Sequence, residues 1–214
     1  MRAANALCLA ETPHRAIPGG AAAPRLARGG RGQGRRTLAP VLNGVRGADM
    51  AGGIFISYRR DDTRHVAGRL AGDLMDRFGA ERIFRDIDSI DAGDEFPRRL
   101  DKALNHCVLM LVLIGRQWLG ATDGQQRRRL DDPNDWVRLE IATALRRGIR
   151  VVPVMVEDTA LPPEDQLPEE LRPLVRRQAR MLSDARWRGD LQAMVDFVVK
   201  LPGMTPLDAA PANP

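Results

Sequence analysis

From residue 54 onward, short apolar stretches alternate with segments in which apolar residues recur every three or four positions. The apolar stretches predict β-strands at 54–58, 83–86, 108–114 and 150–156, with a weak strand near 179–182. The recurring positions predict helices at 61–79, 96–107, 132–145 and 191–199. The stretch 108–114 is apolar throughout, as a central parallel strand buried on both faces should be. Alternating strands and helices therefore predict an α/β fold, a doubly wound parallel sheet.

The segment 131–145, DDPNDWVRLEIATAL, predicts a helix with one unusual polar position. We expect Asp132 to cap this helix and Pro133 to be its first residue, where the missing N–H costs nothing. Glu140 lies one turn after Trp136, at the border of the apolar face, and no residue three or four positions away is basic. At about 100° per residue the two side chains are about 40° apart around the axis, so they share one edge. Glu140 is then either a solvated boundary residue or one wall of a cleft.

The two ends of the chain differ from its middle in composition. Residues 1–50 are rich in Ala, Gly, Arg and Pro and show no apolar periodicity, so we predict that they are disordered. They carry eight Arg and two acids, a charge of +6 within a total of +5, and the remaining residues therefore sum to −1. A transit segment is not favoured, because residues 1–50 are neither Ser-rich nor amphipathic. A nucleic-acid or membrane tail and untranslated sequence before Met50 both remain open. Residues 202–214, rich in Pro and Ala, predict a disordered C-terminal tail.

The charge and the cysteines exclude several classes of protein. The body of the chain is not basic, so we do not expect it to bind nucleic acid except through its N-terminal tail. Cys8 and Cys107 support neither a disulfide framework nor a zinc site, which favours a reducing, cytoplasmic location. The longest apolar run, 107–115, is too short to cross a bilayer, and no secretory signal is visible. We expect no metal and no bound cofactor.

Ligands of open parallel sheets bind beyond the carboxyl ends of the strands, which directs attention to the loops 58–62, 86–95 and 115–132. The first loop lacks the glycines of a dinucleotide-binding fingerprint, and no phosphate-binding P-loop occurs in the chain. The central strand does not end in the aspartate of a phosphoacceptor domain. Ser57 lacks the context of a hydrolase nucleophile, so acyl hydrolysis is not expected.

Four blocks resemble the TIR domain family in order and spacing, and most of all its NAD-cleaving members. They are FISYRR at 55–60, FRDIDSIDAGDEF at 84–96, DWVRLEIATAL at 135–145 and VVPV at 151–154. The resemblance covers about residues 53–200 and implies a TIR domain at 51–201 with a flavodoxin-like, five-stranded parallel sheet. It implies that Glu140 is the catalytic carboxylate. It places these residues beside the nucleotide: Tyr58, Arg59, Arg60, Phe96 and Trp136.

The resemblance also identifies 86–95 as the BB loop, through which TIR domains associate, with Asp88, Ser89, Asp91 and Gly93 as assembly residues. It implies NAD⁺ as substrate, homotypic TIR–TIR association, and a possible TIR-containing partner or activator. The loop acids do not have the spacing of a calcium motif, so a solvated loop face is the simpler interpretation.

One carboxylate can suffice for cleaving NAD⁺, because nicotinamide leaves as a neutral molecule and needs no general acid. The glutamate would stabilise the oxocarbenium-like ribose while Arg59 and Arg60 hold the pyrophosphate. An ordinary solvated basic pair is the competing interpretation of the two arginines. A non-catalytic TIR adaptor that acts by homotypic assembly is the alternative function. The sequence also leaves open whether a catalytic product would be linear or cyclic ADP-ribose.

Overall fold

The computed structural model describes residues 52–85 and 96–207 of the chain, with the backbone alone for 96–99. The predicted disordered segment 1–50 lies outside these ranges, as do residues 208–214 of the predicted tail 202–214. So do the four assembly residues predicted in the BB loop, Asp88, Ser89, Asp91 and Gly93.

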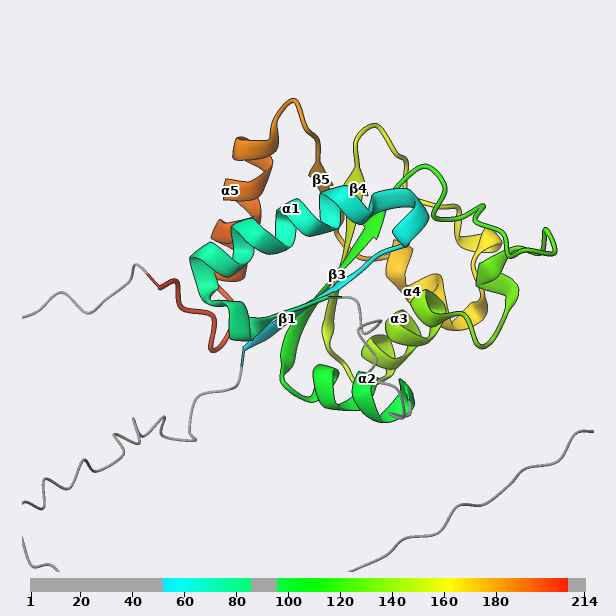
Figure 1. Cartoon of the computed structure of the whole chain (residues 1–214), viewed down its shortest axis with the longest axis horizontal. Coiled ribbons are helices and arrows are strands. Elements are labelled where there is room, and N and C mark those ends of the chain that lie inside the picture. Colours follow the sequence, from blue (N-terminus) through cyan, green and yellow to red (C-terminus); the bar gives the residue numbers. More distant parts are fainter. Residues whose placement is uncertain (1–51, 86–95, 208–214) are drawn as a thin grey trace, which may run out of the picture. The chain divides into compact units, whose positions relative to one another are not determined.

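The described residues form one five-stranded parallel sheet (Figure 1). Its strands are β1 (Gly53–Ser57), β2 (Ile83–Arg85), β3 (Cys107–Ile114), β4 (Arg150–Val156) and β5 (Arg180–Leu182). Their spatial order is β2-β1-β3-β4-β5, and every neighbouring pair is parallel. This is the strand order of flavodoxin-like folds, so the predicted fold class is confirmed.

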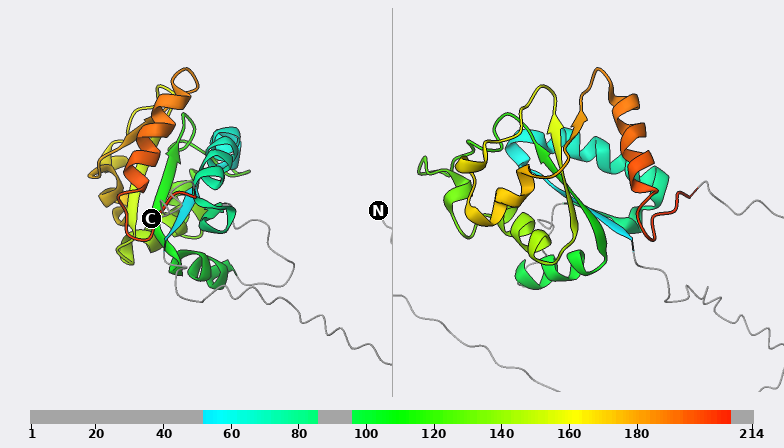
Figure 2. Two further views of the ribbon diagram at one scale, coloured as in Figure 1. Left: turned by 90° about the vertical axis from the view of Figure 1, so that its left-hand side faces the viewer. Right: turned by 180° about the vertical axis from the view of Figure 1, so that it is seen from behind.

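Helices cover both faces of the sheet, as Figure 2 shows from two further sides. They are α1 (Arg60–Phe78), α2 (Phe96–Asn105), α3 (Trp136–Arg146), α4 (Arg172–Val175) and α5 (Trp187–Val198). The buried side chains of α1 and α5 pack on one face of the sheet, and those of α2, α3 and the residues around α4 pack on the other. None of the helices within the described ranges is long and apolar enough to cross a membrane.

Strand β3 contributes side chains to the cores on both faces of the sheet. Its residues alternate between the two faces, with Leu109, Leu111 and Leu113 in one core and Met110 and Val112 in the other. All five are inaccessible to solvent. A strand buried on both faces must be apolar at every position, which is why its sequence shows no alternation.

Helix α3 begins three residues later than the sequence predicts. Asp135, not Asp132, is its N-cap, and the Asp135 carboxylate accepts a hydrogen bond from the Arg138 N–H at 3.1 Å. Asp132 instead accepts a hydrogen bond from the Asn134 N–H at 2.8 Å, in a turn that precedes the helix. Both aspartates satisfy the local rules for a cap, so the choice between them depends on the tertiary partners of Asp135 described below.

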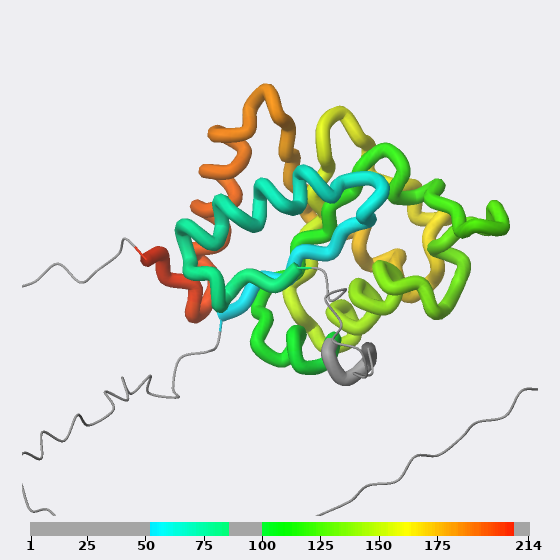
Figure 3. The backbone as a smooth tube through the Cα atoms, viewed as in Figure 1, coloured from blue at the N-terminus to red at the C-terminus, as the bar shows by residue number. Residues whose placement is uncertain are grey.

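The domain continues past residue 201, where the sequence predicts that it ends. Met204 is 3% exposed and belongs to the core between the sheet and α1. The Leu207 N–H donates to the Arg77 carbonyl at 2.8 Å, and the Arg82 side chain donates to the Gly203 carbonyl at 2.6 Å. Figure 3 shows this last segment beside the start of β1. The predicted tail at 202–214 therefore begins too early.

Candidate functional site

The strand order places a topological switch point between β1 and β3. The chain leaves β1 through α1 toward β2, on one side, and the strand on the other side of β1 is β3. Connections that diverge from neighbouring strands leave space at the carboxyl edge of the sheet, where ligands of such folds bind. Ser57 ends β1 and Ile114 ends β3 at this edge, and α3 packs in the core beside both strands.

Glu140 is buried at this edge rather than solvated. Its residue is 7% exposed, and the Ser57 hydroxyl donates a hydrogen bond to Glu140 Oε2 at 2.7 Å. Ser57 itself is 1% exposed. Burying a carboxylate in a domain core is costly unless polar groups compensate it, so its place here requires a specific arrangement. The interpretation of Glu140 as a solvated boundary residue is wrong.

Arg59 is also buried, at 2% exposed, and its guanidinium faces the protein. Its two terminal nitrogens donate to the two carboxylate oxygens of Asp135 at 3.0 and 3.1 Å, in a bidentate ion pair. Arg59 Nε donates to the Trp118 carbonyl at 3.0 Å. The geometry therefore favours a structural contact for Arg59 over the pyrophosphate contact that its motif suggests.

The other predicted substrate residues differ in exposure. Trp136 is the first residue of α3 and is 41% exposed, so much of its indole faces solvent one turn before Glu140. Arg60 begins α1 and is exposed, whereas Tyr58 is mostly buried against the core that holds α1. Phe96 begins α2, and its side chain lies outside the description. The structure thus brings Glu140 and the end of β1 together, with Trp136 at the same helix edge.

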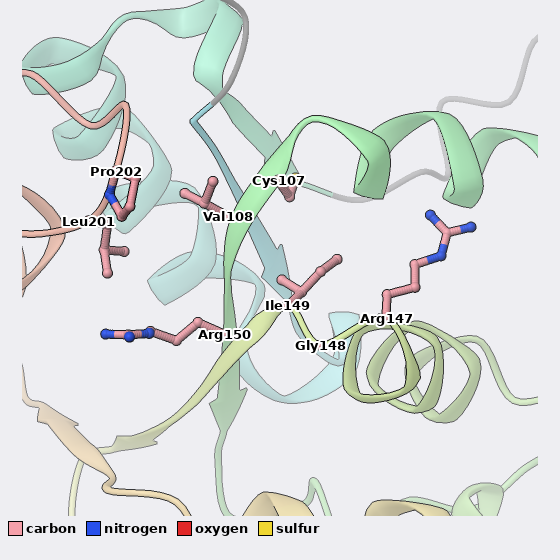
Figure 4. Close-up of a pocket in the computed structure, with 8 residues that line it drawn as sticks. All are labelled: Cys107, Val108, Arg147, Gly148, Ile149, Arg150, Leu201 and Pro202. Atoms are coloured by element: carbon pink, nitrogen blue, oxygen red, sulfur yellow. The ribbon is translucent and has the colours of Figure 1, made fainter.

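A pocket lies at the opposite edge of the sheet (Figure 4). This pocket of about 400 Å³ is lined by the amino ends of β3 and β4 and by residues that follow α5. Arg147 and Arg150 point away from one another in Figure 4, so they do not converge on a common ligand. Burial raises the pKa of the Cys107 thiol, which also lines the pocket, to about 12. A protonated thiol and two diverging arginines do not form a catalytic group.

The roles of Ser57 and Asp135 are not evident from the sequence. Ser57 donates its hydrogen bond to Glu140 across 83 residues of sequence, so no local pattern reveals the contact. Asp135 pairs with Arg59 across 76 residues. A signal for Asp135 existed, because an aspartate directly before the first apolar position of a helix is a strong capping candidate.

A flavodoxin-like sheet with a buried glutamate at the carboxyl edge, next to a half-exposed tryptophan, defines the class of domain. The chain belongs to the TIR domain family, whose model matches residues 54–193. It is 26% identical to the NAD(+) hydrolase sarm1 of Drosophila melanogaster over 121 residues, which are 56% of this chain and 8% of that protein. The chain therefore matches only a small part of the length of this relative.

The chain is also similar to the TIR domains in a structure of the activated Roq1 resistosome directly recognizing the pathogen effector XopQ. The alignment has a TM-score of 0.48 and 17% identity, and it covers 70% of this chain and 98% of that one.

Proposed function

We propose that this TIR domain is an NAD⁺ nucleosidase, with Glu140 as its catalytic carboxylate. The observation that carries the proposal is the position of that carboxylate: buried at the carboxyl edge of the sheet, held by Ser57 at 2.7 Å, and one turn from a half-exposed tryptophan. The sequence similarity to an NAD(+) hydrolase supports the same assignment.

The reaction breaks the bond between C1′ of the ribose and the ring nitrogen of nicotinamide. The bonding electron pair leaves with nicotinamide, whose ring becomes neutral, and positive charge develops on the ribose. A fixed negative charge next to that ribose stabilises the transition state more than the ground state, because the sugar charge appears only as the bond breaks. Water then adds to C1′ and releases a proton, which gives ADP-ribose. A hydroxyl or ring nitrogen of the same molecule adding instead would give a cyclic product.

The neighbouring side chains can take supporting roles in this reaction. The exposed part of Trp136 offers an aromatic face for a flat nicotinamide or for the ribose beside it. Arg60, at the start of α1 and exposed, is the better placed of the two arginines to meet the pyrophosphate. Tyr58 and Phe96 would complete the walls of the nucleotide site. We assign the BB loop residues to homotypic assembly, in a cytoplasmic setting, with activity dependent on that assembly.

The alternative is a TIR adaptor that acts only by association with other TIR domains. Such a protein has no need for a buried carboxylate at the ligand edge, and an apolar residue at position 140 would pack in this place at lower cost. The presence of Glu140 next to Ser57 therefore favours the enzyme.

The test compares Glu140→Gln with wild type, both as full-length protein concentrated on beads to promote assembly. Glutamine keeps the size of the side chain and can still accept the Ser57 hydrogen bond, but it lacks the charge. Electrostatic stabilisation at comparable sites is worth about 3–4 kcal/mol, so release of nicotinamide from NAD⁺ should fall about 10²- to 10³-fold. Glu169→Gln, the same change at an exposed position, is the matched control and should be as active as wild type.

Each result decides between the two functions. If wild type releases nicotinamide and Glu140→Gln does so equally fast, Glu140 is not the catalytic residue. If assembled wild type releases none, the adaptor function replaces the enzyme. Chromatography of the products separates ADP-ribose from its cyclic form.

A further inference from the structure

One charged cluster next to the site has no place in the chemistry above. The Asp135 carboxylate, 2% exposed, accepts two hydrogen bonds from Arg59 and one from Arg129 Nε at 3.1 Å. It also accepts the capping hydrogen bond of the Arg138 N–H. Two arginines and one helix N-terminus thus converge on a single buried carboxylate.

The cluster joins parts of the chain that are far apart in sequence. Arg59 lies two residues after Ser57, directly beyond β1, and Asp135 lies 76 residues later, directly before α3. The Arg59 contact with the Trp118 carbonyl adds the loop that follows β3. A single guanidinium therefore connects the segment after β1 and the loop after β3 to the N-cap of α3.

This ion pair adds to the Ser57–Glu140 hydrogen bond, which joins the end of β1 to α3. Along the helix axis the two contacts are about 7.5 Å apart, because Glu140 lies five positions after Asp135 at a rise of about 1.5 Å each. A helix held at one point can pivot about it. Two contacts on different turns fix both the position of α3 along β1 and its rotation.

A buried ion pair of this kind is a poor device for stability alone. Desolvating a guanidinium and a carboxylate costs much of what their attraction returns, and apolar side chains of similar size often stabilise a core as well or better. What the pair provides is a defined geometry, since a bidentate fork fixes both distance and orientation.

We propose that Asp135 is a positioning residue for the NAD⁺-cleaving site. Through its ion pair with Arg59 it fixes the register of α3 against β1, and so holds the Glu140 carboxylate where the ribose charge develops. The proposal rests on the function proposed above. It also gives Arg59 a different task from Arg60: Arg59 aligns the helix, and Arg60 meets the substrate.

The variant Asp135→Asn tests this directly. Asparagine caps a helix as well as aspartate does, so the cap is kept while the charge that pairs with Arg59 is lost. The matched control is Asp131→Asn, which makes the same change in an exposed ion pair with Arg128 that does not contact β1.

The expected effect is on turnover rather than on substrate binding. A displacement of about 1 Å at a catalytic group costs up to about 10²-fold in rate, so kcat of Asp135→Asn should fall about 10- to 100-fold. The KM for NAD⁺ should stay within about threefold, because Arg60 begins α1 and its place does not depend on Asp135. Asp131→Asn should match wild type in both constants.

A double variant separates positioning from stability. Asp135→Asn leaves Arg59 buried without its partner, and adding Arg59→Met removes that uncompensated charge, so the double variant should recover melting temperature. It should not recover kcat. The proposal is overturned if the double variant recovers kcat together with its melting temperature. It is also overturned if Asp135→Asn has the kcat of wild type after correction for the folded fraction.

Hydrogen–deuterium exchange gives a measurement that does not depend on activity. In Asp135→Asn, amides of residues 136–141 should exchange at least about tenfold faster than in wild type, while β4 and α5 stay unchanged. Unchanged exchange in α3 overturns the positioning role, whatever the activity. If wild type releases no nicotinamide, the proposed function fails by itself, and exchange in α3 then decides the positioning role alone.

Discussion

The hydrogen bond between Ser57 and Glu140 should contribute measurably to the free energy of unfolding. The variant Ser57→Ala keeps the strand and the Cβ atom and removes only the hydroxyl that donates to Glu140 Oε2 at 2.7 Å. Hydrogen bonds to charged groups contribute about 1.5–3 kcal/mol, and both residues here are buried. For a domain of about 150 residues, each kcal/mol shifts Tm by about 2–4 °C, so we expect Tm to fall by about 3–12 °C.

A double-mutant cycle assigns that loss to the hydrogen bond rather than to packing. The cycle compares Ser57→Ala, Glu140→Met and the double variant by urea unfolding followed by circular dichroism. Methionine has a similar length and no hydrogen-bonding oxygen. Each single variant and the double variant therefore lack the Ser57–Glu140 hydrogen bond, so the two single losses together count it twice and the double variant counts it once. We expect a coupling free energy of about 1.5–3 kcal/mol. A coupling below about 0.5 kcal/mol would refute the reasoning, because the two single changes would then act independently.

Three further outcomes follow from the structure and the assembly hypothesis. Replacing Gly93 in the BB loop with Trp should weaken oligomers in sedimentation and reduce nicotinamide release in parallel, without lowering Tm. Gly115→Ala should cost about 1–3 kcal/mol in urea unfolding, since its Cβ would lie 2.6 Å from Cγ2 of the buried Thr63 and 2.5 Å from Asp62 Oδ2. An unchanged midpoint would contradict the packing. In a Cys8→Ser background, Cys107 should react with a disulfide reagent at pH 8 about 10³-fold more slowly than a free thiol, because its pKa rises from 9.0 to about 12. The free energy of unfolding should also fall between pH 9 and 12, because the Cys107 thiol ionises in the unfolded chain before it ionises in the folded one.

The fold could be predicted from the sequence because it depends on periodicity along the chain. The continuous apolar run of β3 and the four-residue spacing in α1 each reflect a local rule of burial, and the structure confirms both. The N-terminus of α3 and the extent of the C-terminal segment were misplaced for a different reason. Met204 is buried in the core, but the residues around it in the sequence are rich in Pro and Ala, a composition that predicts a tail.

The site could be predicted only in part, because its geometry depends on contacts between distant residues. Glu140 and Trp136 share a helix, so helix geometry alone places them on one edge. The donor to Glu140 is 83 residues away in Ser57, and no local pattern connects the two. The sequence accordingly leaves Glu140 either solvated or in a cleft, and only the packing of α3 on β1 selects burial.

Arg59 and Arg60 show how far a motif can assign roles. They are adjacent and chemically identical, yet Arg59 is buried and Arg60 is exposed. Asp135 and the Trp118 carbonyl accept the hydrogen bonds of Arg59, and its burial depends on such partners because an uncompensated buried charge is costly. The same aspartate therefore determines where α3 begins and which of the two arginines faces inward. The substitution Asp135→Ala should thus affect a cap, an ion pair and the helix that carries Glu140 together, whereas Arg60→Ala should raise the KM for NAD⁺ and leave α3 in place.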